Sequence, residues 1–65
     1  MKPHQERVVV ELEELSTKLQ KLNEFIENNS NFAAIDSDEQ SRLKRQSEIM
    51  QDYVNILQER INAFT

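Results

Sequence analysis

The sequence predicts an all-α fold, an antiparallel two-helix hairpin that packs its second apolar stripe in a homo-oligomer. Three observations predict it. The 65 residues include no glycine and a single proline, so the tight turns of a β-rich protein are disfavoured. Two segments carry apolar residues at alternating spacings of four and three, the period of one helical face. The chain also has more apolar residues than one such face on each helix can hold.

The first helix is expected from about Pro3 to Glu27. Proline suits the first turn, where its missing N–H has no partner to lose. One apolar stripe runs through this segment, and the residues between its members are mostly Glu, Lys and Gln, which are good helix formers. The stripe consists of Val8, Leu12, Leu15, Leu19, Leu22 and Ile26.

A connector is expected at about 28–36. The run ENNSN at 27–31 ends the first helix, because Asn and Ser side chains compete for helical backbone hydrogen bonds. The apolar run FAAI at 32–35 is expected to cover the end of the hairpin as a single helical turn.

The second helix is expected at about 37–63. Asp36 with Glu39, or Ser37 with Gln40, has the spacing of a capping box, and an acidic first turn complements the helix dipole. The apolar stripe of this helix consists of Met50, Val54, Leu57, Ile61 and Phe64.

A second apolar stripe is left over, and two helices are expected to leave it uncovered. Burying each such side chain fully is worth about 1.5–3 kcal/mol, which is large for so small a chain. The chain has no cysteine for disulfides, so we expect this stripe to pack against other copies or a partner. It consists of Val9, Phe25, Ile49, Tyr53 and Ile56.

Composition excludes most catalytic chemistry. His4 is the only histidine, and with no cysteine neither a metal site nor a nucleophilic dyad can be completed. We therefore expect no catalytic residue, no metal, no cofactor and no enzymatic activity. The net charge of −4 argues against DNA or RNA polymers as partners. No run of residues approaches the ~18 apolar residues of a membrane span, so a cytosolic protein is expected.

A polar ridge flanks the two stripes. It comprises Gln46, Tyr53 and Arg60 on the second helix and Arg7, Glu11, Glu14, Lys18 and Lys21 on the first. Lysine, arginine and an aromatic ring can together bind the phosphates and bases of a nucleotide. The alternative is a solvated face, in which Glu14 pairs with Lys18 within the helix and Arg60 favours the helix dipole.

Two segments carry a resemblance to a known family. They are QERVVVELEELSTKLQKLNEFI at 5–26 and LKRQSEIMQDYVNILQERINAF at 43–64. The chain resembles the phage anti-CBASS cyclic-nucleotide sponge family (the second anti-CBASS protein type). The resemblance implies helical hairpins that assemble into homohexamers in the cytoplasm of an infected host bacterium. It also implies sequestration, without cleavage, of cyclic dinucleotides such as cGAMP and of cyclic trinucleotides at separate sites.

The resemblance also implies site residues. For the dinucleotide site it implies a lysine on the first helix, matched by Lys18 or else Lys21. An N-terminal aromatic residue of that site is replaced here by His4. For the trinucleotide site it implies an arginine on the last helix, matched by Arg60, and a polar residue matched by Gln20 or Thr17.

Two other functions stay open. The chain could be a helical-hairpin protein–protein interaction module of phage origin with no nucleotide ligand. A small nucleic-acid-binding regulator would depend on Arg42, Lys44 and Arg45, and the acidic net charge disfavours it.

Overall fold

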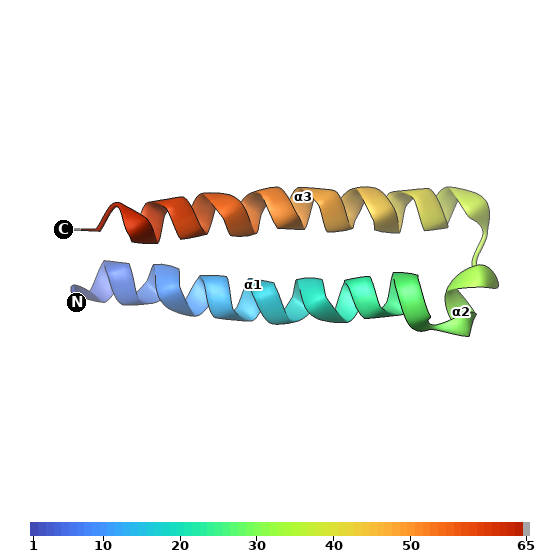
Figure 1. The fold of residues 1–65 in the computed structure, drawn as a ribbon, viewed down its shortest axis with the longest axis horizontal. Helices are drawn as coiled ribbons and strands as arrows, with labels where there is room; N and C mark the ends of the chain where they lie inside the picture. Colours follow the sequence, from blue (N-terminus) through green and yellow to red (C-terminus); the bar gives the residue numbers. More distant parts are fainter. Residues whose placement is uncertain (65) are drawn as a thin grey trace.

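A computed structural model describes residues 1–64 and shows the helical hairpin. It contains α1 (Pro3–Asn28), α2 (Ser30–Ala33) and α3 (Ser37–Asn62). The two long helices run antiparallel side by side, α2 lies at the closed end, and the start of α1 and the end of α3 lie at the open end (Figure 1). The molecule measures 47 × 15 × 14 Å. Within residues 1–64, none of the helices has the length and apolar character needed to cross a bilayer.

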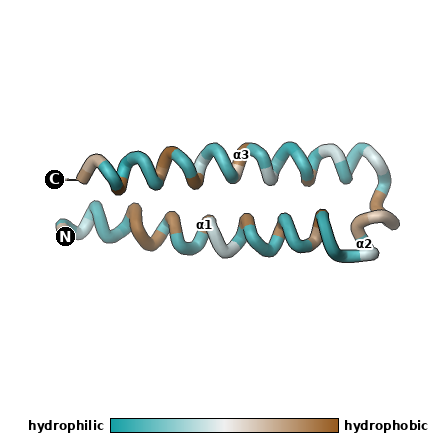
Figure 2. Tube along the Cα trace, viewed as in Figure 1, coloured by the Kyte–Doolittle hydropathy of each residue, from teal (hydrophilic) through white to brown (hydrophobic). Residues whose placement is uncertain are grey.

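The core lies along the seam between α1 and α3. Hydrophobic residues recur between hydrophilic ones along both helices (Figure 2). Val8 and Leu19 of α1 are buried, and Leu57 of α3 is completely buried. The other members of the two predicted stripes are half-buried. The stripe of α3 continues back through Ser47 and Leu43, which are half-buried too. The predicted all-α hairpin is therefore confirmed.

Local hydrogen bonds explain where α1 begins and ends. The side-chain oxygen of Gln5 accepts a bond of 3.1 Å from the backbone N–H of Lys2, one of the donors that a helix start leaves free. At the other end, the backbone N–H of Asn29 donates to the carbonyl of Phe25 over 3.3 Å. The Asn29 side chain accepts from the Asn31 N–H over 2.9 Å and caps α2. The helix ends at Asn28, one residue later than expected.

An apolar cluster closes the hairpin, but its helical turn is α2 at Ser30–Ala33 and not the FAAI run at 32–35, because Asn29 caps the turn. The rings of Phe25 and Phe32 meet edge to face, with 6.0 Å between their centroids. The Nζ of Lys44 lies 5.8 Å from the Phe32 centroid. The Gln40 side chain donates to the carbonyls of Phe32 and Ile35, each over 2.9 Å. Gln40 therefore ties the connector to α3.

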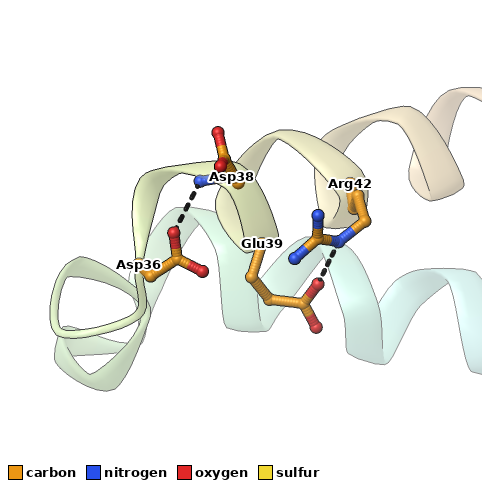
Figure 3. Close-up of polar contacts among 4 residues, drawn as sticks. All are labelled: Asp36, Asp38, Glu39 and Arg42. Carbon is orange, nitrogen blue, oxygen red and sulfur yellow. Dashed lines mark hydrogen bonds and ion pairs between the residues drawn. The ribbon is translucent and has the colours of Figure 1, made fainter.

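The start of α3 differs from the expected capping box. Asp36 is the N-cap, and its carboxylate accepts from the Asp38 N–H over 3.0 Å (Figure 3). Glu39 does not bond back to the cap, since it forms an ion pair of 2.7 Å with Arg42 (Figure 3). Gln40 is occupied by the connector carbonyls. Asp36 thus caps α3 without a reciprocal partner, and α3 ends at Asn62, one residue earlier than expected.

The second stripe is only partly uncovered by the hairpin. Ile49, Tyr53 and Ile56 are 61%, 43% and 53% exposed. The expectation was wrong for Val9 and Phe25, which are half-buried. Phe25 is covered because the connector folds Phe32 onto it. The uncovered apolar surface therefore belongs mainly to α3.

Candidate ligand-binding face

A hydrogen bond across the seam shows which flanks of the two long helices meet. The Tyr53 hydroxyl donates to the carboxylate of Glu11, 42 residues away in the sequence. Each of these residues immediately precedes a stripe position on its helix, so the residues with that placement share one side of the hairpin. We call this side the Tyr53 face. It comprises Arg7, Glu11, Glu14, Lys18, Lys21 and Phe25 on α1 and Arg42, Gln46, Ile49, Tyr53, Ile56 and Arg60 on α3.

The Tyr53 face is basic although the chain is acidic. It carries five basic and two acidic side chains, in a chain whose net charge is −4. The opposite face, made of the residues that immediately follow stripe positions, carries Glu13, Glu27 and Glu48 against a single Lys44. The local potential of the Tyr53 face therefore favours anions despite the net charge, because nearby charges dominate at short range.

Antiparallel packing sets the order of the candidate residues along the face. Arg60 lies seven residues beyond Tyr53, and His4 seven residues before Glu11, so both lie toward the open end. Lys18 lies seven residues beyond Glu11 in the opposite direction. Seven helical residues span about 10 Å, so Lys18 and Arg60 are about 21 Å apart along the hairpin. One hairpin does not bring them into a single pocket.

The candidate cations are open to solvent. The cations Lys18, Lys21 and Arg60 are all exposed, and so is the His4 side chain. The Glu14–Lys18 pair of the alternative interpretation does not form, since the ion pair within residues 1–64 is that of Arg42 with Glu39. Lys21 lines a shallow groove of about 400 Å³ with Phe25 and the end of α1. These cations are thus available to an anionic ligand or to another chain.

Gln20 lies away from the other candidate residues. It immediately follows the stripe residue Leu19 and lines a groove of about 440 Å³ on the opposite face, together with Asn23 and Gln51. Its amide donates to the carboxylate of Glu24 over 3.3 Å. The alternative, Thr17, donates its hydroxyl to the Glu13 carbonyl over 3.0 Å. The resemblance pairs Gln20 or Thr17 with Arg60, and one hairpin does not place Gln20 and Arg60 on the same face.

Some features of the face were not found in the sequence. Arg42 was grouped with Lys44 and Arg45, yet the structure places Arg42 on the Tyr53 face and Lys44 on the opposite one. The sequence did contain a signal for this placement, because Arg42, Ile49 and Ile56 are spaced by seven residues and therefore lie on one side of the helix. Val10, which is 49% exposed, borders the face beside Arg7 and Glu11. No periodic pattern marks Val10.

The side chains of the face have the chemistry of anion binding. Within residues 1–64, histidine and carboxylate side chains form no group that could hold a metal ion. What the face offers is a set of cations for phosphate oxygens and one exposed aromatic ring, that of Tyr53, for a base.

A comparison with models of protein families identifies the family of the chain. The model of the Sequestin family matches residues 2–63, which include all three helices. The chain belongs to the Sequestin family. The Sequestin name is consistent with a sequestering function. No curated protein and no solved structure matches the chain significantly.

Proposed function

We propose that this protein is a phage-encoded anti-defence protein that sequesters cyclic oligonucleotide immune signals, cyclic dinucleotides, trinucleotides or both, without cleaving them. It acts in the cytoplasm of the infected bacterium as a homo-oligomer, which we propose is a homohexamer. By binding the signal, it keeps the host effector from being activated. It is a ligand-binding protein and not an enzyme, and DNA and RNA polymers are not its partners.

The observation that carries the proposal is the basic, tyrosine-bearing face of an otherwise acidic chain. A cyclic oligonucleotide presents closely spaced phosphates and bases that can stack. Lysine and arginine bind phosphate oxygens, and an aromatic ring stacks on a base with useful energy for any base type. Membership in a family named for sequestration supports the same function.

The spacing along the face supports two separate sites. Lys18 and Lys21 lie on one side of the Glu11–Tyr53 pair, and Arg60 lies on the other. His4, which the resemblance groups with Lys18, lies on the Arg60 side, so one hairpin does not join His4 and Lys18 in a single site. We assign the lysines to a dinucleotide site and Arg60 to a trinucleotide site. Each site is completed by a neighbouring subunit, because a single hairpin leaves Lys18, Lys21 and Arg60 exposed to solvent.

Assembly would cover the exposed apolar side chains of the hairpin and gather its cations. Ile49, Tyr53 and Ile56 are exposed, and they lie among the cations of the Tyr53 face. Packing Ile49 and Ile56, the apolar strip of this face, against another copy buries apolar surface and brings cations of several chains together. Partial removal from water strengthens their attraction for phosphates.

Calorimetric titration of the purified protein with a panel of cyclic di- and trinucleotides tests the proposal. We expect saturable binding of at least one class, and recovery of the intact ligand after the protein is denatured by heat. Linear dinucleotides of the same bases are the ligand control. Arg45→Ala is the control for the site variants Lys18→Ala and Arg60→Ala. Arg45 lies outside the Tyr53 face, and each of the three substitutions removes one positive charge.

Two outcomes would contradict the proposal. If no cyclic nucleotide in the panel binds, the protein is not a nucleotide sponge. If the recovered ligand is cleaved, the protein is an enzyme and the ligand its substrate.

A second candidate is a protein–protein interaction module of phage origin with no nucleotide ligand. The exposure of Ile49 and Ile56 favours it, because exposed apolar strips on small proteins often bind other proteins. Such a module would give no heat with any cyclic nucleotide.

A further inference from the structure

The Tyr53 ring is tied to the other helix through Glu11. Its hydroxyl donates to the Glu11 carboxylate across the seam. Ile49 and Ile56, the neighbours of Tyr53 on this side of α3, are apolar, so α3 offers the phenol no polar partner there. The position of the ring on the Tyr53 face therefore depends on α1.

We propose that Glu11 is the positioning residue of the ligand-binding face. It holds the Tyr53 ring across the seam, between the lysines on one side and Arg60 on the other, where the ring serves as a stacking surface for a base of the ligand. Glu11 does not contact the ligand and acts only through Tyr53. This inference rests on the proposed function.

Burial supports this assignment. Tyr53 is 43% exposed, less than Ile49 at 61% and Ile56 at 53%. The ring is thus partly covered and yet open enough to accept a base. Without its bond to Glu11 the ring would turn toward either isoleucine, and a ligand would have to order it again. Ordering one such side chain weakens binding by roughly three- to tenfold.

Glu11 acts through its acceptor oxygen more than through its charge. Lys18 and Arg60 each lie about 10 Å from the Glu11–Tyr53 pair along the axis, roughly one Debye length at physiological salt. The negative charge of Glu11 is therefore largely screened at both cation positions. A neutral side chain that still accepts a hydrogen bond should replace it.

Four variants test the assignment: Glu11→Gln, Glu11→Ala, Tyr53→Phe and the double variant Glu11→Ala/Tyr53→Phe. Glu13→Ala is the matched control, because it removes the same charge on the opposite face. Tyr53 is the only tyrosine and the chain has no tryptophan, so the near-UV circular dichroism band of tyrosine reports on this ring alone. The second measurement is the affinity for a cyclic dinucleotide, and far-UV circular dichroism checks that each variant is helical.

We expect Glu11→Ala to weaken the tyrosine band and to lower affinity roughly three- to tenfold. Glu11→Gln and Glu13→Ala should leave both the tyrosine band and the affinity unchanged. Tyr53→Phe should lower affinity by a similar factor, and the double variant should bind no more weakly than either single variant, because both remove one interaction.

An unchanged tyrosine band and unchanged affinity in Glu11→Ala would overturn the assignment. So would equal losses in Glu11→Gln and Glu11→Ala, because charge and not ring position would then be the cause. A wild-type protein that binds no cyclic nucleotide would overturn the proposed function and the ligand role of Glu11 with it. The tyrosine band distinguishes that failure from a failure of Glu11 to hold the ring.

Discussion

The Ser47 hydroxyl donates a hydrogen bond to the side-chain oxygen of Asn23 across the seam. Both residues are half-buried. Asn23 lines the groove on the side opposite the Tyr53 face, so this bond and the bond of Tyr53 to Glu11 join the helices on opposite sides of the core. Two such bonds define one register of α1 against α3.

The Ser47–Asn23 bond should contribute measurably to stability. Ser47→Ala leaves the Asn23 amide half-buried without its partner, and we expect a loss of about 1 kcal/mol in the free energy of unfolding. The double variant Ser47→Ala/Asn23→Ala should be scarcely less stable than Ser47→Ala alone, because the two residues share one interaction. Urea unfolding at a fixed protein concentration measures both. Ser41→Ala, at an exposed position of α3, is the control, and additive losses in the double variant would contradict the prediction.

Gln40 should hold the closed end of the hairpin. Its amide donates to the carbonyls of Phe32 and Ile35, and we expect Gln40→Ala to lower the free energy of unfolding by about 1–2 kcal/mol. Gln40→Glu should cost at least as much, because a carboxylate cannot donate to either carbonyl. Thermal unfolding measures the effect. Gln58→Ala is the control, since the Gln58 amide donates to the exposed Asn62 and not to the connector. Equal stabilities of the Gln40 and Gln58 variants would show that the connector closes without Gln40.

The long helices were predictable because their signals are local and repeated. The predicted stripe repeats its period over about five turns in α1 and about four in α3, so an error at one position does not change the pattern. Contacts of the connector were not predictable in the same way. Gln40 has capping-box spacing from Ser37, but its side chain bonds to carbonyls five and eight residues earlier in the chain, which no short motif encodes.

The candidate site was predictable only in part. The seven-residue spacing of Gln46, Tyr53 and Arg60 placed them correctly on one flank of α3. This flank meets the Glu11 flank of α1 because the helices pack antiparallel. The Tyr53–Glu11 hydrogen bond shows this contact, and it joins residues 42 apart in the sequence. The same packing places Gln20 and Arg60 on opposite faces of one hairpin. The resemblance paired these two residues without any information on the packing.

Charges introduced into the exposed apolar strip should abolish self-assembly. The double variant Ile49→Asp/Ile56→Asp places two carboxylates where another copy would have to bury them, and burying an unpaired charge is strongly unfavourable. We expect the mass measured by analytical ultracentrifugation to fall from that of the wild-type oligomer to that of a single chain.

Asn55→Asp/Asn62→Asp is the matched control for assembly. It adds the same charge at exposed positions of α3 that lie on the opposite face, and it should keep the wild-type mass. A wild-type protein that sediments as a single chain would contradict the homo-oligomer itself. An unchanged mass in the isoleucine variant would place the interface elsewhere.

Lys18→Ala and Arg60→Ala should separate the two ligand classes. The two residues are about 21 Å apart along one hairpin, so we expect each substitution to weaken one class and to spare the other. Loss of a charged hydrogen bond to a phosphate costs about 1.5–3 kcal/mol, which is roughly 10- to 100-fold in affinity at each site that uses it. Lys18→Ala should weaken cyclic dinucleotides, and Arg60→Ala should weaken cyclic trinucleotides.

The same titrations distinguish this arrangement from a single shared pocket. If subunits brought Lys18 of one copy to Arg60 of another, either substitution would weaken both classes equally. The salt dependence of the affinity is a second test, because phosphate contacts weaken as ionic strength rises. The affinity of each variant should depend less on salt than that of the wild type, but only for the ligand class that the substitution weakens. Full affinity of both variants for both classes would contradict the assignment of Lys18 and Arg60. Lys21 and Arg42, the other basic residues of the Tyr53 face near the closed end, would then be the phosphate-binding candidates.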